Sequence, residues 1–293
     1  MAARHYENFP VASRLLPRVM RPHVAAVYAF ARTADDFADE GVCAPDERRR
    51  LIDDWESRVR ASRAGDDRAA RPALPGQPPE TVDIFLALGE TIRRLDLPVS
   101  LFEDLLSAFR QDIMTTRYER WSDVLDYCRR SANPVGRLVL RIAGARDPSL
   151  DERSDDLCTA LQLANFWQDF GRDWQHGRLY VPLEDLRACG ARAEDLARGV
   201  VTHEWRCAFR RVVDRTRALF DRGRGACDGV RGRLRIELRL TWLGGCRILE
   251  RFERQGYDPL RDRPVLGLLD APVLAWRLLR WRAAGPARAG HHD

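Results

Sequence analysis

The sequence contains no lysine. All 49 basic residues in the chain of 293 are arginine. A P-loop nucleotide site needs a lysine on the phosphates, and Schiff-base or pyridoxal-phosphate chemistry needs a lysine amine. The absence of lysine therefore excludes these kinds of site. With 44 acidic residues the formal net charge is only +5, which suits an anionic substrate or a membrane surface, and we expect no nucleic-acid partner.

Cysteine is sparse and shows no pattern. The seven cysteines are odd in number and none has C-x-x-C spacing. This distribution predicts reduced thiols in a cytoplasmic protein, with neither a disulfide framework nor a zinc site. The seven are Cys43, Cys128, Cys158, Cys189, Cys207, Cys227 and Cys246.

Long apolar runs are also missing. No stretch approaches the ~20 residues of a membrane-spanning helix. The first residues, M-A-A-R-H, lack the apolar region of a secretory signal. We therefore expect a cytoplasmic protein, with peripheral contact at the inner face of the membrane as an alternative.

Strand patterns are absent, and helical patterns are found along most of the chain. Alternating β-branched residues and Asn-Gly turns, which typify hairpins, do not occur, whereas apolar residues recur at helical periods. We predict an all-α protein with one domain over residues 1–293, a Pro- and Gly-rich surface loop at 64–80 and a second interruption at 177–192. The predicted helices are 18–40, 46–62, 81–95, 99–117, 121–143, 151–175, 203–228 and 233–255.

Two acidic clusters lie far apart in this helical pattern. Asp35, Asp36 and Asp39 form the first, and the second is a stripe at i, i+4 and i+8. Such spacing places side chains on one face of a helix. Facing stripes of this kind would bind Mg²⁺ through hard oxygen ligands, with substrate phosphates completing the coordination. The second stripe is Asn165, Asp169 and Asp173.

A solvated helix face is the ordinary alternative for such acidic pairs. The helix around the second stripe is apolar on most of its circumference, which is typical of a buried helix, and buried carboxylates need partners or metals. In the first cluster, Arg32 lies one turn before Asp36. It either pairs with Asp36 or clamps phosphate oxygens beside the metals.

Four segments resemble the squalene/phytoene synthase family, in order and over almost the whole chain. Residues 5–17 (H-Y-E-N-F-P-V-A-S-R-L-L-P) are similar to its substrate-contacting N-terminal segment, and residues 28–39 (Y-A-F-A-R-T-A-D-D-F-A-D) to its first aspartate-rich motif. Residues 126–136 resemble the central helix that kinks beside the reaction centre. Residues 160–182 are similar to the second metal motif and the G-R-L-Y-V-P that follows it.

The resemblance implies the all-α isoprenoid synthase fold with a central apolar cavity. It also implies a prenyl diphosphate substrate and Mg²⁺ held by Asp35, Asp36, Asp39, Asn165, Asp169 and Asp173. The implied catalytic residues are Tyr127, Asp35, Asp39, Asp169 and Asp173. The implied substrate-binding residues are His5, Phe9, Tyr28, Arg32, Gln162, Asn133, Arg172 and Arg178, and Arg263 is a further candidate for the phosphate oxygens.

Departures from the commonest family pattern indicate a subtype. Gln168 stands where phytoene and squalene synthases usually carry Arg, Asn133-Pro134 where they carry small residues, and Gly245 where Tyr is common. These residues resemble the hopanoid-pathway branch, whose members turn presqualene diphosphate into hydroxysqualene. Handover to other enzymes of that pathway is then expected. Condensation to presqualene diphosphate, squalene or phytoene is one alternative, and a non-catalytic assembly factor is another.

The segment 266–293 suggests a partner. Trp276 and Trp281 lie among arginines in an otherwise apolar sequence, which is typical of a helix at a membrane interface. A final helix packed on the core is the alternative.

Overall fold

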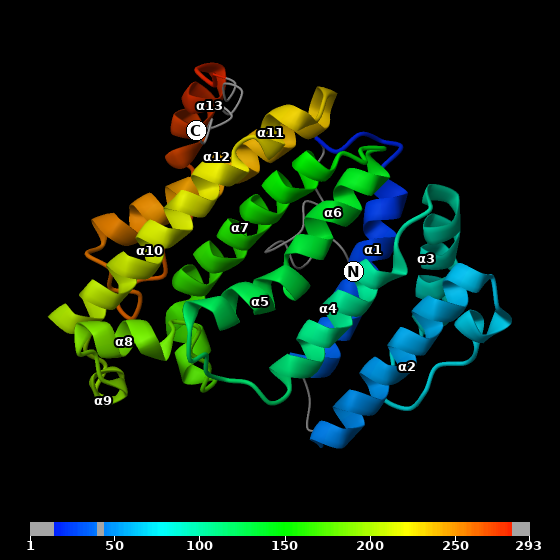
Figure 1. Ribbon diagram of the computed structural model, residues 1–293, viewed down its shortest axis with the longest axis horizontal. Helices are drawn as coiled ribbons and strands as arrows, with labels where there is room; N and C mark the ends of the chain where they lie inside the picture. Colours follow the sequence, from blue (N-terminus) through cyan, green and yellow to red (C-terminus); the bar gives the residue numbers. More distant parts are fainter. Residues whose placement is uncertain (1–14, 40–43, 283–293) are drawn as a thin grey trace, which may run out of the picture.

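Helices account for nearly all the regular structure of the protein. The computed structural model describes residues 15–39 and 44–282, without the side chain of Asp39, and within these ranges it has no strand. The predicted all-α class is confirmed (Figure 1). The helices are α1 (Arg21–Asp39), α2 (Pro45–Ala64), the 3-10 helix η2 (Asp67–Ala70), α3 (Thr81–Leu95), α4 (Val99–Asp112), α5 (Trp121–Ser131), α6 (Asn133–Ile142), α7 (Pro148–Gln175), α8 (Leu183–Cys189), α9 (Ala193–Ala197), α10 (His203–Gly223), α11 (Ala226–Gly229), α12 (Gly232–Arg254) and α13 (Asp270–Leu279).

Two predicted helices are wrong as single elements. The helix predicted over 121–143 breaks at Ala132, because Pro134 has no N–H to donate to the Arg130 carbonyl and its ring would clash with that carbonyl, whereas proline begins a new helix well. The helix predicted over 203–228 ends at Gly223 and resumes as the single turn of α11. The interruption predicted at 177–192 contains α8, which is too short to show a helical period.

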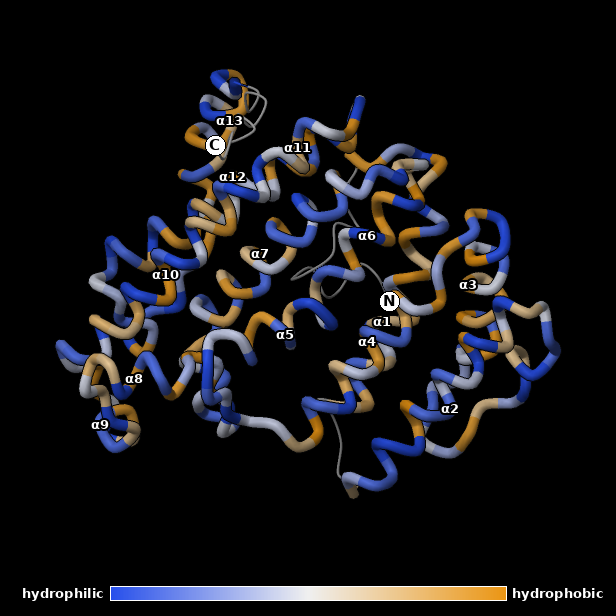
Figure 2. The backbone as a smooth tube through the Cα atoms, viewed as in Figure 1, coloured by the Kyte–Doolittle hydropathy of each residue, from blue (hydrophilic) through white to orange (hydrophobic). Residues whose placement is uncertain are grey.

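The long helix α7 organises the fold. It packs against α5, α6, α10, α11 and α12, while α1 packs against α2, α3, α4 and α6. Figure 1 shows α2 and α3 toward one end of the long axis and α8 to α10 toward the other. Most helices carry hydrophobic residues on one side and hydrophilic residues on the other (Figure 2). One hydrophobic cluster runs through both halves and includes the fully buried Phe30, Trp55, Trp167 and Trp205.

One cysteine pair corrects the expectation of reduced thiols throughout. Cys189, which ends α8, forms a disulfide with Cys207 in the first turns of α10. Their separation of 18 residues carries no recognisable spacing. The packing of α8 against α10 brings them together, and sequence alone does not reveal it. Cys43 lies outside the described residues.

In the part of the chain that the structure describes, no helix combines the length and the apolar character needed to cross a membrane.

Candidate functional site

The α7 stripe is held by a network centred on Asp169. The Asn165 side-chain amide donates to Asp169 Oδ2 at 2.8 Å, and Arg263 donates to both carboxylate oxygens, from Nε at 2.5 Å and from Nη2 at 3.2 Å. Arg172 Nη1 lies 3.8 Å from Oδ1. Only 15% of the Asp169 side chain is exposed. Charge-assisted bonds in such a place hold the carboxylate in a fixed orientation.

Gln168 attaches the same helix to the segment that carries Arg263. Its side-chain amide donates to the Pro264 carbonyl at 2.8 Å. This bond helps to hold residues 263–264 against α7.

On α1 the first acidic cluster is paired internally. Arg32 Nη1 lies 3.1 Å from Asp35 Oδ2, and Nη2 lies 2.5 Å from Asp36 Oδ1. These three side chains are each about one third exposed. The ion pair that the sequence left open thus forms in this structure, and phosphate clamping by Arg32 stays a prediction.

The donor chemistry of both stripes fits Mg²⁺. Asp35, Asp36, Asn165 and Asp169 supply carboxylate and amide oxygens, the ligands that hard cations prefer. Among the side chains that the structure describes, no group of three or more His, Cys, Asp or Glu converges on one point. Each stripe would therefore supply only part of a coordination shell, and Asp39, whose side chain is outside the description, belongs to the first.

Tyr127 lies at the centre of a buried polar and aromatic group that the sequence did not reveal. Its hydroxyl donates to Asp112 Oδ2 at 2.8 Å, at the last residue of α4. Its ring is 6.1 Å from Phe166 and 5.7 Å from Tyr118, and Phe166 stacks on Tyr180 with centroids 3.7 Å apart. We call Tyr118, Tyr127, Phe166 and Tyr180 the aromatic cluster. All four side chains and Asp112 are buried.

Two connecting segments position Tyr118 and Tyr180. The Leu179 amide donates to the Thr116 carbonyl at 2.9 Å, and the Leu183 amide donates to the Tyr118 carbonyl at 2.9 Å. The chain reaches this pairing through Gly177, whose φ of +78° is in the region that favours glycine. The G-R-L-Y-V-P motif therefore delivers Tyr180 to the aromatic cluster, a role that its sequence signals only weakly.

The phenols of the aromatic cluster remain protonated. Burial, and then the charge of Asp112, raises the pKa of Tyr118, Tyr127 and Tyr180 above the ordinary value. Asp173 further raises the pKa of Tyr180, and Arg178 opposes it, which places these two predicted site residues within electrostatic range of the aromatic cluster. These tyrosines can donate hydrogen bonds and present π faces, but they are poor bases.

Three further predicted residues lie on three different helices. Asn133 is buried at the start of α6 and accepts a hydrogen bond from Thr159 Oγ1 at 2.8 Å, so its polar group faces α7. Gln162 and Tyr28 are half-buried on α7 and α1. His5 and Phe9 lie outside the described residues. The roles proposed for all these residues stay predictions.

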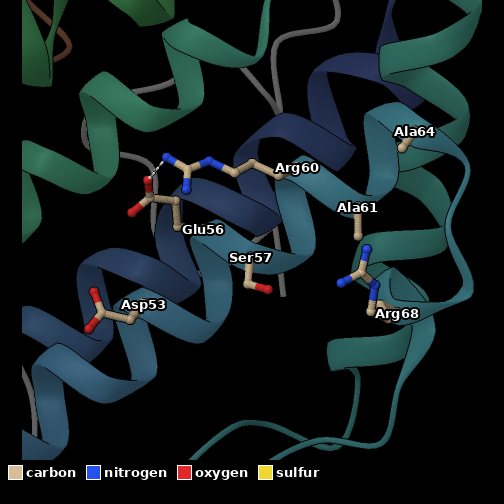
Figure 3. A pocket seen from close by; sticks show the side chains of 7 residues that line it. All are labelled: Asp53, Glu56, Ser57, Arg60, Ala61, Ala64 and Arg68. Carbon is tan, nitrogen blue, oxygen red and sulfur yellow. Dashed lines mark hydrogen bonds and ion pairs between the residues drawn. The ribbon is translucent and has the colours of Figure 1, made fainter.

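A surface hollow beside α2 has a charged lining, unlike the aromatic cluster. It has a volume of about 530 Å³. Figure 3 shows Arg60 paired with Glu56 in its lining, with Arg68 nearby. The lining is open and of mixed charge, as on a solvated helix face. It is not the apolar cavity that the family resemblance implies.

Comparison with known proteins agrees with the motifs. Residues 2–270 match the squalene/phytoene synthase family. The chain is 35% identical over 271 residues to the hydroxysqualene synthase of Sinorhizobium fredii, covering 92% of this chain and 86% of that one. It is 34% identical over 261 residues to the hydroxysqualene synthase of Zymomonas mobilis, covering 88% and 82%. A solved structure, the squalene synthase HpnC from Alicyclobacillus acidocaldarius, matches with a TM-score of 0.77 and 42% identity over 87% of this chain and 91% of that one.

Proposed function

The chain belongs to the squalene/phytoene synthase family, and on that premise we propose that it converts presqualene diphosphate into hydroxysqualene in a Mg²⁺-dependent reaction. Presqualene diphosphate and water give hydroxysqualene and diphosphate. The water oxygen bonds to carbon and its proton leaves to solvent. The observation that carries the proposal is the similarity to hydroxysqualene synthases over about nine tenths of the chain.

The residues around Asp169 support diphosphate binding. Asn165, Asp169 and Asp173 on α7, with Asp35, Asp36 and Asp39 on α1, are the residues that would hold Mg²⁺. The bound ion would neutralise the departing diphosphate. Arg263 lies at the Asp169 carboxylate already and is only one quarter exposed. Its guanidinium can pass to the phosphate oxygens when a cation neutralises Asp169.

The aromatic cluster supports the carbocation half of the reaction. Loss of diphosphate leaves a cyclopropylcarbinyl cation, which π faces stabilise by about 0.5–2 kcal/mol each. Because burial holds the pKa of the three phenols high, these groups do not remove a proton from the cation. Asp112 is occupied by the Tyr127 hydroxyl. Such surroundings favour capture by an added nucleophile over loss of a proton.

The test supplies purified protein with presqualene diphosphate or farnesyl diphosphate, each with Mg²⁺ or with EDTA. The expected product is hydroxysqualene from presqualene diphosphate alone, dependent on Mg²⁺. Conversion of farnesyl diphosphate would show instead a condensing synthase. The absence of diphosphate release from both substrates would favour a non-catalytic role.

A reductant distinguishes the second candidate. The structural relative at 42% identity is named a squalene synthase, and a hydride in place of water would give squalene. Repeating the assay with NADPH decides between them: hydroxysqualene as the unchanged product supports water capture, and squalene contradicts it. Product handover to other enzymes of the hopanoid pathway stays a prediction.

A further inference from the structure

The helix α13 and the segment before it expose apolar side chains to solvent. Leu268 is 94% exposed, Leu269 85%, Leu279 86% and Trp276 53%. From Ala271 to Leu279, every exposed position is apolar. This arrangement is the reverse of an ordinary surface helix, which presents polar residues to water. We call these residues the outer face: Leu268, Leu269, Ala271, Pro272, Ala275, Trp276 and Leu279.

The opposite side of α13 is attached to α12 through charges. Asp270 is 1% exposed and accepts hydrogen bonds from Arg247 at 2.8 Å and from Arg251 at 2.6 Å. Farther along, Arg277 pairs with Glu250 at 2.6 Å. These paired groups fix the helix without using its outer face. The outer apolar side chains are therefore held in a defined orientation rather than left on a loose end.

The exposed charged side chains of residues 265–282 are all positive. Asp270 is the sole acidic residue between positions 265 and 282, and it is buried. Arg280 and Arg282 are exposed at the end of the helix. The Arg280 guanidinium lies 4.4 Å from the centre of the Trp276 ring. The surface thus combines leucine, tryptophan and unbalanced positive charge.

We propose that the outer face docks on an anionic lipid membrane, with its leucines and Trp276 entering the interface and its arginines at the headgroups. Apolar residues beside Trp and Arg are what an interfacial helix requires. A second copy of the chain is a poorer partner, because the segment that would form the contact carries Arg280 and Arg282 and offers no exposed carboxylate to pair them. The proposal concerns the outer surface and does not depend on the proposed reaction.

The test is flotation of the full-length protein with phosphatidylcholine vesicles, with and without about 30 mol% phosphatidylglycerol, enough anionic lipid to give the surface a negative potential. The double variant L268S/L279S removes two exposed leucines and should weaken binding to the anionic vesicles by about tenfold or more. The control is L86S, because Leu86 is 56% exposed on α3, toward the other end of the molecule. It should bind like the unsubstituted protein.

Two further measurements test the arginine contribution and the entry of Trp276 into the bilayer separately. Raising the salt to about 1 M should weaken binding, because the arginine contribution is screened. Lipids brominated on their acyl chains should quench the fluorescence of the unsubstituted protein more than that of the variant W276F. The proposal is wrong if the unsubstituted protein does not float with anionic vesicles, or if L268S/L279S floats equally well. Light scattering that shows a dimer lost in L268S/L279S, without vesicle binding, would assign the face to a second copy.

Discussion

At the scale of single residues, the hydrogen bond from the Tyr127 hydroxyl to Asp112 should affect both the stability of the protein and its proposed reaction. Y127F removes the donor to the buried Asp112 carboxylate, 2.8 Å away. The unfolding free energy should fall by about 1–3 kcal/mol, the usual cost of an unpaired buried group. Turnover should fall by about 10- to 100-fold, because the ring loses its fixed position. Denaturant unfolding and steady-state kinetics measure the two effects.

Tyr118 provides the matched control. Its hydroxyl accepts a longer bond, 3.3 Å, from the Gln111 amide, and no charge is involved. Y118F should therefore cost less than Y127F in both assays. Equal losses in the two variants would contradict a special role for the Asp112 contact.

Arg263 permits a second test at the same scale. R263Q removes the guanidinium charge that is bonded to the Asp169 carboxylate. It also removes the charge-assisted hydrogen bonds that we propose Arg263 makes to the diphosphate. KM for the diphosphate substrate should rise by about 10- to 100-fold. The neighbouring Arg261 is exposed, so R261Q should leave KM unchanged. If both variants raise KM alike, the effect is one of overall charge and not of position.

At the scale of the element, two adjacent glycines of α12 should behave in opposite ways. A Cβ at Gly245 would lie 2.5 Å from Phe220 and 2.9 Å from Leu161, whereas a Cβ at Gly244 meets only Leu266, at 3.5 Å. G245A should lower the unfolding free energy by about 1–3 kcal/mol. G244A should change it little or raise it by up to about 1 kcal/mol. Thermal or denaturant unfolding of the pair tests the packing of α12 on α7 and α10.

The attachment of α13 should depend on pH. The Gly267 amide, and then Arg247 and Arg251, lower the pKa of Asp270 well below its ordinary value of 3.8. A carboxyl group whose pKa is lower in the folded state adds stability that is complete above its unfolded pKa. That stability is lost as the pH falls below about 4. D270N should be less stable at neutral pH and should lose less stability on acidification, as measured by urea unfolding across that range.

The Cys189–Cys207 disulfide should stabilise the whole molecule against unfolding. It closes a separation of 18 residues between α8 and α10, which constrains the unfolded chain by about 3 kcal/mol. Adding dithiothreitol should lower the free energy of unfolding of the oxidised protein by about that amount. The variant C207S should not respond to the reductant. A response of C207S equal to that of the unsubstituted protein would show that dithiothreitol acts elsewhere.

The helical architecture could be predicted because its signals are local. Apolar residues at helical periods over 151–175 predict α7, observed as Pro148–Gln175. The family motifs also imply the isoprenoid synthase fold, and the matching relatives confirm the resemblance. The apolar period does not show the break at Ala132, because a proline in the first turn of a helix looks, in sequence, like one inside a longer helix. Only the resemblance of residues 126–136 to a kinked helix implies it.

The site was predictable only where its residues share one helix. Asn165 and Asp169 were named from their spacing, and they do interact. Asp112, Tyr118 and Tyr180 were missed because they come from a helix end and two connecting segments, which the pairing of Thr116 with Leu179 brings together. An acidic residue at a helix end and a tyrosine in a loop are too common in sequence to signal such a cluster.

Residues 263–270 connect the inside of the protein to its outer surface. Arg263 is bound to Asp169 and Pro264 to Gln168, while Asp270, at the other end, is bound to α12. The first two leucines of the outer face lie between these attachments. A ligand that draws Arg263 away from Asp169 therefore acts on the segment that would meet the lipid. Linkage makes any such effect mutual: lipid must change the affinity for diphosphate by the same factor as diphosphate changes the affinity for lipid. If diphosphate strengthens lipid binding, lipid strengthens diphosphate binding equally, and the proposed substrate is bound best at the bilayer, where its hydrocarbon chains are dissolved.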